Sequence, residues 1–335
     1  MRYNQDFIIL SNTDFKGLNV LVTGADGFIP SFVCDRLVEL GANVTALVRR
    51  NSSNVIKSIP HLKTHLKIRW GEISDLSLLV QETKDTDIIY HLGAQSHVQY
   101  SLHNPLETYV TNTVGTANVL EAARINDVRK IVHAGSAEVY GKPNKVPITE
   151  DNELVPRSPY AAGKVASDRL MFSYFCTYDM PVVMSRFFGI YGPRQSIEKA
   201  IPKFILKILN NEPPVVYGDG KQSRDYMYVT DAADAYAKLG VANDVDGQVI
   251  NIGTGTELTI ADLAQKILDL MNSDLKPIFS GKINPGEAGR LFTDPTNCMK
   301  KLDWSPKIGL EEGLKNTIDY FTENKELYKH LDVVV

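Results

Sequence analysis

Residues 18–28, with the sequence LNVLVTGADGF, decide the fold. Leu18–Thr23 is a mostly apolar run, which is typical of a strand that is covered on both faces of a parallel sheet. Gly24 and Gly27 allow a tight turn, and helical periodicity continues from about residue 28 to residue 40. A buried strand that passes through a glycine turn into a helix predicts the first unit of an open α/β sheet.

The chain repeats this alternation up to about residue 190. Strands are predicted at 43–48, 66–70, 87–92, 130–135 and 181–188, with helices at 74–84, 104–125 and 159–179. This spacing predicts an α/β fold with a doubly wound parallel sheet, the Rossmann arrangement. We expect a Rossmann domain at 1–190, beginning with an arm at 1–17 and completed by a return strand near 249–253. A smaller C-terminal α/β substrate lobe is predicted at 191–335.

The composition is that of an ordinary globular protein, with a net charge of only -4. The absence of a basic excess argues against nucleic acid or an anionic membrane as a partner. No apolar run is long enough to span a membrane, so we expect a cytoplasmic protein. The three cysteines are far apart and lack metal-ligand spacing, which predicts neither a metal site nor a disulfide framework.

The glycine turn is a candidate site for the pyrophosphate of a dinucleotide. Backbone N–H groups and the helix dipole can approach an anion closely where glycines leave no side chains in the way. The predicted contacts come from Gly24, Asp26, Gly27, Phe28 and Ile29. Pro30 occupies the position where a third glycine is expected. Proline suits the first turn of a helix, but its ring adds bulk where helix and strand should pack closely.

The end of the second strand bears on the choice of cofactor. An acidic residue at this place would bind the ribose 2′-hydroxyl of NAD. The chain has Arg49, Arg50, Ser52 and Ser53 here, and these side chains suit a 2′-phosphate. The sequence therefore favours NADP over NAD.

Four reactive side chains are predicted to meet at the end of the strand at 130–135. Ser136 and Glu138 follow that strand directly. Tyr160 and Lys164 lie four residues apart on the helix that starts after Ser158, and so share one face of it. A free phenol has a pKa of about 10. A neighbouring ammonium and an oxidised nicotinamide would both favour the phenolate, which can then act as a base.

These motifs together resemble the NAD-dependent epimerase/dehydratase family of extended short-chain dehydrogenases/reductases, which acts on nucleotide-diphosphate sugars. The resemblance covers about residues 17–322. Besides the glycine turn and the Ser136, Tyr160 and Lys164 set, it rests on His91–Ala94, Asn112–Thr116, Tyr191–Arg194, Tyr217–Gly220, Arg224-Asp225 and Asn251–Gly253.

The resemblance implies roles for individual residues. Tyr160 would be the catalytic base, Lys164 its electrostatic partner and a ribose ligand, and Ser136 the hydroxyl that binds the sugar O4. Further cofactor contacts would come from Glu72, Ile73, Leu92, Gly93, Ala94 and Phe187, with Asn112 as a buried support. Substrate contacts would come from Ser96, His97, Gly189, Val216, Tyr217, Arg224 and Arg290, the two arginines clamping the diphosphate. The family usually has Asn where this chain has Gly189. A homodimer through a four-helix bundle is also implied.

The exact reaction depends on Glu138. In this family, Tyr160 would remove the O4 proton while hydride leaves C4, giving a 4-keto sugar. A 4-epimerase needs no further acid or base, whereas a 4,6-dehydratase needs a carboxylate to remove the C5 proton. Glu138 stands at the dehydratase position, although the Asp that the dTDP-glucose type has at the place of Ala137 is missing.

We therefore expect a nucleotide-sugar 4,6-dehydratase. Ala94–Val98 and the arginine pair Arg49-Arg50 resemble the GDP-mannose type. The alternatives are a 4-epimerase, a UDP-uronate decarboxylase and, from another class, a non-catalytic nucleotide-sensing subunit. Only Pro30 and Gly189 support the last of these.

Overall fold

The computed structural model describes residues 15–50, 65–282 and 289–328. Most of the predicted arm at 1–17 lies outside these residues, as do Ser52 and Ser53. None of the helices in the described ranges is long and apolar enough to cross a membrane.

A seven-stranded sheet forms the centre of the molecule, and every neighbouring pair of its strands is parallel. The strand order is β10-β6-β5-β4-β1-β2-β3. The bounds are β1 Asn19–Thr23, β2 Asn43–Val48, β3 Leu66–Trp70, β4 Ile88–His91, β5 Lys130–Ala134, β6 Val182–Phe187 and β10 Val249–Ile252. The predicted doubly wound sheet and its return strand are confirmed. The order reverses between β1 and β4, and ligands bind beside the carboxyl ends of strands at such a point.

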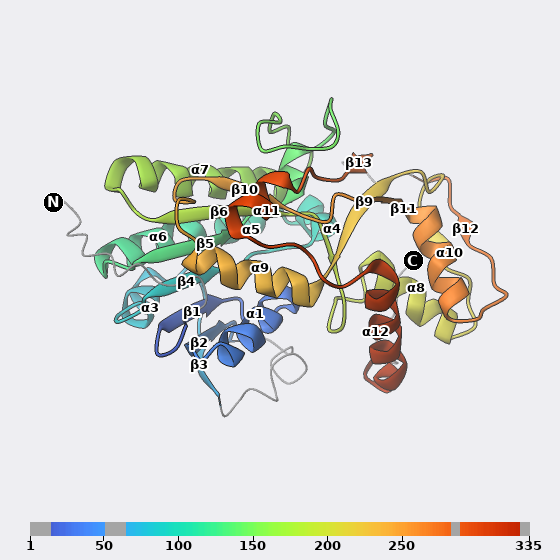
Figure 1. Cartoon of the computed structure of the whole chain (residues 1–335), viewed down its shortest axis with the longest axis horizontal. Helices are drawn as coiled ribbons and strands as arrows, with labels where there is room; N and C mark the ends of the chain where they lie inside the picture. Colours follow the sequence, from blue (N-terminus) through green and yellow to red (C-terminus); the bar gives the residue numbers. More distant parts are fainter. Residues whose placement is uncertain (1–14, 51–64, 283–288, 329–335) are drawn as a thin grey trace.

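Helices cover both faces of this sheet (Figure 1). On one face, Val20 and Val22 pack in a core with α1 (Phe28–Glu39) and α9 (Val229–Val241). On the other face, Leu21 packs in a core with α3, α6 and α7. The bounds of these three helices are Leu76–Glu82, Gly115–Ile125 and Pro159–Tyr178. Because side chains alternate along a strand, burial on both faces requires the near-continuous apolar runs that identify these strands in the sequence.

The helix predicted at 104–125 is present as one continuous run at 105–125, with a π-helical turn inside it: α5 (Pro105–Tyr109), the turn (Val110–Val114) and α6 follow one another without a gap. A short helix that the sequence did not predict, α4 (Val98–His103), precedes it. The break between α4 and α5 lies before Pro105, because proline disfavours helical geometry in the preceding residue, and Asn104 has φ −128° and ψ 60°. The π-helical turn contains the buried Asn112.

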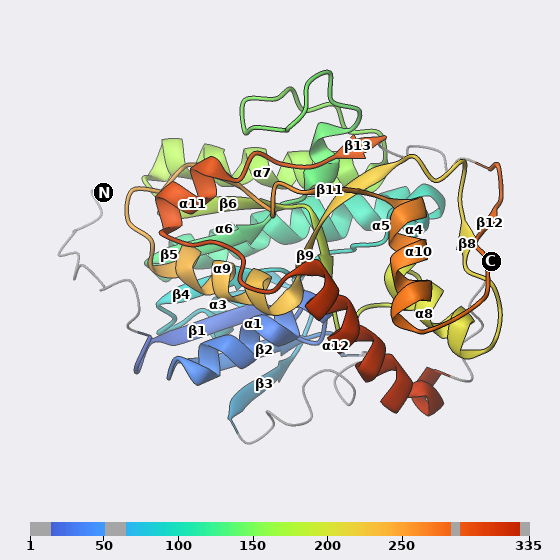
Figure 2. The ribbon, with the colours of Figure 1, turned by 45° about the vertical axis from the view of Figure 1, so that its right-hand side comes forward.

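A smaller lobe follows β6 (Figure 2). Its sheet contains β7 (Gly189–Tyr191), β9 (Ser223–Tyr228), β11 (Glu257–Thr259) and β13 (Arg290–Leu291), and a second pair is β8 (Val215–Val216) with β12 (Ile278–Phe279). Its helices are α8 (Ala200–Leu209), α10 (Ile260–Leu270) and α12 (Leu310–Glu323), while α11 (Thr296–Leu302) packs near β10. The division at residue 190 stays a prediction, but α9 returns from the second half of the chain to pack against α1.

The contact between α9 and the sheet gives a test of this packing. A Cβ atom on Gly240 would lie 2.0 Å from the hydroxyl oxygen of Tyr90, which is fully buried on β4. We expect Gly240→Ala to lower the free energy of unfolding by about 1–3 kcal/mol through overpacking. Gly289→Ala is the control, since no atom lies within 4 Å of its added Cβ. Equal melting temperatures for the two variants would contradict the packing of α9 on β4.

Candidate active site

The glycine turn brings the ends of β1 and β4 close together. Gly24 has φ +68°, and a Cβ atom on it would lie 2.8 Å from the Cα of Gly93. The Gly93 N–H donates to the Thr23 hydroxyl at 2.9 Å. Gly27 is the N-cap of α1, whose first turn carries no acidic side chain. Exposed helix N–H groups beside a loop without side chains fit a pyrophosphate, so these residues suit a dinucleotide.

Pro30 fits into α1 without disturbing it. It is the third residue of the helix, and the Ser31 N–H donates to the Gly27 carbonyl at 3.0 Å. The missing N–H of Pro30 therefore removes no helical hydrogen bond. A Cβ atom on Gly27 would lie 3.1 Å from the Cγ of Pro30, so Gly27 makes room for the proline ring.

The other predicted cofactor residues lie along the same edge of the sheet. Arg49 and Arg50 are exposed at the end of β2. Glu72 is exposed and Ile73 is buried after β3, while Asp26 is buried and Leu92 and Ala94 are half-buried. On β6, the Phe187 ring stacks on Tyr236 with centroids 4.3 Å apart and planes 20° apart.

The start of α7 fixes the position of Tyr160. Ser158 caps the helix by accepting a hydrogen bond from the Ala161 N–H at 3.2 Å, and Pro159 occupies the first turn. The Tyr160 N–H, which has no partner within the helix, donates to the Ser101 hydroxyl of α4 at 3.2 Å. The helix that the sequence did not predict thus supports the central residue of the site.

Ser136, Tyr160 and Lys164 come together as predicted. The Lys164 Nζ donates to the Ala134 carbonyl, the last residue of β5, at 2.8 Å. Burial lowers the pKa of Lys164 to about 8, and Asp168 opposes this shift. Burial raises the pKa of Tyr160 to about 12, and a hydrogen bond with Ser136 opposes that shift. Burial therefore makes the Tyr160 phenol harder to deprotonate and the Lys164 ammonium, one helical turn further along α7, easier to deprotonate.

Glu138 lies on the 3₁₀ turn Ala137–Tyr140, directly after Ser136. The Glu138 N–H donates to the Ser136 hydroxyl at 3.2 Å, which fixes the path of this turn. The Glu138 carboxylate is half-buried and interacts electrostatically with both Tyr160 and Lys199. A carboxylate, a phenol and a serine hydroxyl thus share one place at the end of β5.

Glu198 and Lys199 belong to this region, and the sequence did not reveal them. The His97 Nδ1 lies 2.5 Å from the Glu198 carboxylate, and Lys199 interacts with both Glu138 and Glu198. Ser96, beside His97, is exposed. The segment before α8 therefore meets the loop after β4. In the sequence, Glu198-Lys199 is simply a charged pair before an apolar helix, and only the fold places it beside Glu138.

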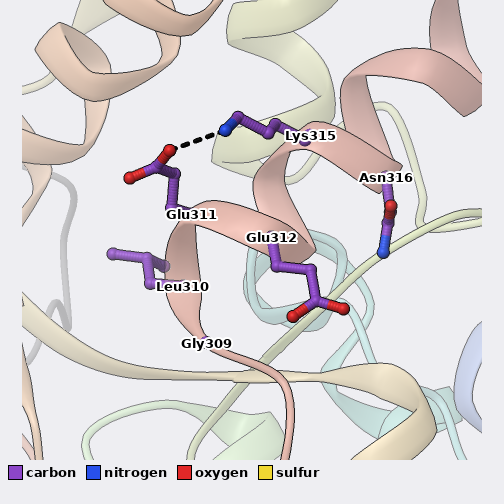
Figure 3. A pocket seen from close by; sticks show the side chains of 6 residues that line it. All are labelled: Gly309, Leu310, Glu311, Glu312, Lys315 and Asn316. Carbon is purple, nitrogen blue, oxygen red and sulfur yellow. Dashed lines mark hydrogen bonds and ion pairs between the residues drawn. The ribbon is translucent and has the colours of Figure 1, made fainter.

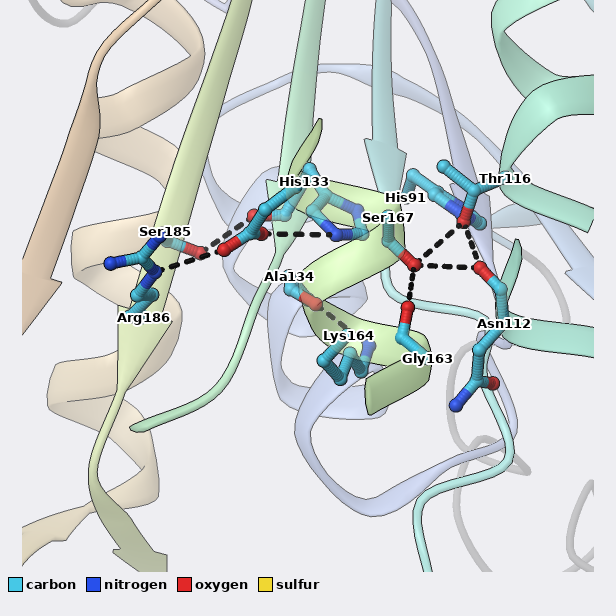
Figure 4. A network of polar contacts seen from close by, with 11 residues as sticks. His91, Asn112, Thr116, His133, Ala134, Gly163, Lys164, Ser167, Ser185 and Arg186 are labelled. Atoms are coloured by element: carbon cyan, nitrogen blue, oxygen red, sulfur yellow. Dashed lines mark hydrogen bonds and ion pairs between the residues drawn. The ribbon is translucent and has the colours of Figure 1, made fainter. Parts of the chain in front are cut away.

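A buried polar network supports the site from below (Figure 4). His91 lies between the hydroxyl oxygens of Thr23 at 2.9 Å and Thr116 at 3.0 Å. The Thr116 hydroxyl donates to the Asn112 carbonyl at 2.6 Å, so His91 Nε2 carries the proton and donates to Thr116. Burial lowers the pKa of His91 to about 3, which keeps the ring neutral. The Asn112 side chain accepts a hydrogen bond from the Gln95 backbone N–H and donates one to the Gln95 carbonyl.

Gly189 marks a close approach between β7 and β9. A Cβ atom on Gly189 would lie 2.7 Å from the Asp225 carbonyl oxygen. The Asn that the family usually has here would not fit this backbone without a shift of β7 or β9.

The two arginines predicted to clamp the diphosphate lie on neighbouring strands of the smaller lobe, and the clamp stays a prediction. Arg290 pairs in register with Ser223, and Leu291 pairs with Arg224, so the two arginine side chains leave opposite faces of the small sheet. Arg290 makes a bidentate ion pair with Glu257, with N···O distances of 2.7 and 2.6 Å.

Val216 and Tyr217, which were predicted as substrate contacts, differ in burial. The Val216 side chain is completely buried in the core of the smaller lobe. Tyr217 is half-buried, with Lys203 Nζ 5.7 Å from its ring centroid.

A hollow of about 550 Å³ lies elsewhere, at the start of α12 (Figure 3). It is lined by Gly309, Leu310, Glu311, Glu312, Lys315 and Asn316. It is wide open, and none of these residues belongs to the site at the strand ends. We assign it no role in the chemistry.

Comparison with known proteins identifies the family. A family model described as GDP-mannose 4,6 dehydratase matches residues 21–317. The chain belongs to this family. The predicted membership of the extended short-chain dehydrogenases/reductases, which include NAD-dependent dehydratases and epimerases, is confirmed.

Relatives of this family member include both dehydratases and epimerases. The chain is 34% identical over 328 residues, 95% of its length, to a trifunctional UDP-glucose 4,6-dehydratase/UDP-4-keto-6-deoxy-D-glucose 3,5-epimerase/UDP-4-keto-L-rhamnose-reductase of Arabidopsis thaliana. It spans about half (49%) of that relative's length. The dTDP-glucose 4,6-dehydratase DesIV of Streptomyces venezuelae, solved with NAD bound, is 29% identical, with a TM-score of 0.87 over 93% of this chain and 99% of that one. A UDP-N-acetylglucosamine 4-epimerase of Methanobrevibacter ruminantium is 32% identical, with a TM-score of 0.87 over 92% and 99%.

The glycine turn can be tested by binding alone. We expect Gly24→Ala to weaken binding of NAD or NADP at least about tenfold, or about 1.4 kcal/mol, because the new Cβ would push Gly93 away. Isothermal titration calorimetry measures the change. Gly281→Ala is a matched control, since Gly281 has a similar φ of +67° but open space around the added Cβ. Unchanged affinity in Gly24→Ala would show that the dinucleotide binds elsewhere.

Proposed function

We propose that this protein is a nucleotide-diphosphate-hexose 4,6-dehydratase that works through a 4-keto sugar. The observation that carries the proposal is the position of Glu138. Its carboxylate interacts electrostatically with Tyr160. Its backbone N–H donates to the hydroxyl of Ser136, which is hydrogen-bonded to the Tyr160 phenol. The family match and the similarity to two 4,6-dehydratases support it.

Each side chain has a definite task in this proposal. Ser136 orients the sugar O4 toward Tyr160, and the phenolate form of Tyr160 accepts the O4 proton. Lys164, held by the Ala134 carbonyl, stabilises that phenolate. A bound nicotinamide supplies the hydride chemistry. Glu138 removes the C5 proton, which the new ketone makes acidic, and passes it to the departing C6 hydroxyl, so that the C6–O bond breaks and water leaves. The hydride taken from C4 would return to C6 and a proton to C5, which gives the 4-keto-6-deoxy sugar.

The alternative is a 4-epimerase, and the similarity to a 4-epimerase structure favours it. Such an enzyme needs Ser136, Tyr160 and Lys164 but has no task for Glu138. A half-buried carboxylate that interacts electrostatically with the phenol therefore favours dehydration. A UDP-uronate decarboxylase, which uses a similar Glu, and a non-catalytic subunit are less favoured, because the base and its ammonium are assembled together.

We further propose that the cofactor is NADP rather than NAD. Arg49 and Arg50 are exposed at the end of β2, beside the predicted place of the adenosine ribose. Guanidinium groups there would bind a 2′-phosphate. Arg49→Ala with Arg50→Ala should then weaken NADP binding by about tenfold or more while leaving NAD binding unchanged. An equal loss for both cofactors would contradict the preference.

We also propose a homodimer through the outer faces of α5, α6 and α7. Large apolar side chains are exposed there, namely Leu106, Tyr109, Val110, Val114, Ile125, Phe172 and Tyr178. Two copies of these faces would form a four-helix bundle and bury the apolar surface. A monomer in analytical ultracentrifugation at micromolar concentration would contradict this arrangement.

The reaction itself is tested by product mass. Incubation with UDP-, GDP-, dTDP- and CDP-hexoses should give, for one of them, a product that has lost one water. We expect Glu138→Gln to lower kcat at least about 100-fold, the usual contribution of a general base. Glu153→Gln, which changes an exposed carboxylate after the same strand, should keep the full rate.

Two results would contradict the proposal. A product of unchanged mass with inverted C4 would make the protein an epimerase. Full activity in Tyr160→Phe would overturn the assignment of the site as a whole.

A further inference from the structure

A cluster of buried charges lies beneath the site, between α7 and the strands β4, β5 and β6 (Figure 4). Lys164 and Asp168 are one helical turn apart on α7, and both are buried. His91 of β4, His133 of β5 and Arg186 of β6 face them, and all three are buried. Arg169, exposed on α7, and Tyr160 and Tyr140 complete the titratable groups around the cluster.

The two histidines carry no charge in this cluster. Burial, together with Lys164, lowers the pKa of both His91 and His133. The buried charges are therefore the cations Lys164 and Arg186 and the anion Asp168. Without Asp168, two cations would be buried together with no counter-charge. Such an arrangement is unfavourable, and the group that can relieve it is the lysine, because an arginine does not lose its proton.

Asp168 is held in a fixed position by contacts on both sides. Its Oδ2 accepts a hydrogen bond from the Arg186 Nε at 2.9 Å. Its Oδ1 lies 3.7 Å from His133 Nε2 and accepts no hydrogen bond from any residue that the structure describes. A Cβ atom on Gly135 would lie 3.0 Å from this Oδ1. Asp168 therefore reaches directly under the strand end that carries Ser136, and Gly135 leaves the room for it.

Arg186 is itself fixed from the far side. Its NH1 donates to the Tyr140 hydroxyl at 2.8 Å, and Tyr140 donates to the Asn251 side chain of β10 at 2.7 Å. The guanidinium is thus shared between Asp168 and Tyr140. Only the Oδ2 of Asp168 is hydrogen-bonded to Arg186, so the Oδ1 can interact electrostatically with the remaining groups of the cluster.

We propose that Asp168 is a positioning residue that keeps Lys164 protonated, and so keeps the phenolate partner of Tyr160 in place. This inference rests on the proposed role of Tyr160 and Lys164. Its physical basis is that Asp168, one helical turn from Lys164, is the sole anion buried in the described cluster. The other contact of the ammonium, the Ala134 carbonyl, is a dipole and carries no net charge.

The direct test is the titration of Lys164 in the full-length protein without cofactor. Carbon-13 NMR of lysine-labelled protein, with the signal assigned by Lys164→Arg, measures it. We expect the wild type to titrate near pH 8. In Asp168→Asn the midpoint should fall by about one pH unit, since the carboxylate that raises the pKa of Lys164 is lost. Asp168→Glu, which keeps the carboxylate, should have a Lys164 midpoint close to that of the wild type.

The second readout is the basic limb of the kcat profile. As pH rises through the lysine pKa, Lys164 loses its proton and the phenolate loses its partner, so kcat falls. This limb should move to lower pH in Asp168→Asn by the same amount as the midpoint. The acidic limb is not used, because Asp168 also raises the pKa of Tyr160 directly.

A double variant that removes one positive and one negative charge controls for the possibility that Asp168→Asn alone does not fold. Asp168→Asn alone leaves Arg186 buried without its carboxylate, which can prevent folding. Asp168→Asn with Arg186→Met removes both charges, and the Lys164 midpoint should still be low. Arg186→Met alone, if it folds, should leave the midpoint at or above the wild-type value.

An unchanged midpoint in Asp168→Asn or in the double variant would overturn the inference. So would an Asp168→Glu variant that behaves like Asp168→Asn. The NMR titration separates this result from the proposed function: a shifted midpoint with an active Tyr160→Phe variant would refute the function but not the coupling between Asp168 and Lys164.

Discussion

The buried ammonium of Lys164 is the group on which the geometry of the site depends. Removing an ammonium from water is unfavourable, and here it lowers the pKa of the lysine to about 8. The charge is tolerated because the Ala134 carbonyl accepts its hydrogen bond and Asp168 lies one turn away. The hydrogen bond to Ala134 requires α7 to start at one position relative to β5. Ser158, Ser101 and the close contact of Gly163 with Asn112 hold it there.

The same requirement explains why so many polar groups are buried around this helix. The Asn112 carbonyl accepts hydrogen bonds from Thr116 and Ser167, and its side chain holds Gln95. One buried residue thereby connects α7, α6 and the loop after β4. Because that loop also carries His97, whose partner is Glu198, the position of the smaller lobe is tied to the helix that carries the base. Rigid support of this kind is what a proton transfer between fixed groups requires.

The central sheet and the grouping of the proposed catalytic residues could be predicted from the sequence for simple physical reasons. Strands buried on both faces must be apolar throughout, and Tyr160 and Lys164 are neighbours on any α-helix. Three features were not predicted: the short helix α4, the π-helical turn at Val110–Val114 and the contact between His97 and Glu198. The π-helical turn lies within one periodic stretch, where a single added residue does not change the apolar pattern. The pairing of Glu198 with His97 joins residues 101 positions apart in the sequence, and no local pattern indicates it.

Backbone geometry adds details to two of the substrate predictions. Gly189 has no room for a side chain because β7 lies against β9. Arg224 and Arg290, which were predicted to clamp the diphosphate, are placed on opposite faces of the small sheet by the parallel register of β9 and β13. Register cannot be deduced from a strand of two residues, so no sequence pattern could have shown this.

The proposal of a 4,6-dehydratase that works through a 4-keto sugar is tested most directly by following the hydrogen atom at C4. A nucleotide-hexose that carries deuterium at C4 is converted, and the product is analysed by mass spectrometry and NMR. The account predicts a product that has lost one water and carries the deuterium at C6, because the hydrogen removed from C4 returns to the same sugar. A product with the deuterium still at C4, or with the deuterium lost to solvent, would contradict it.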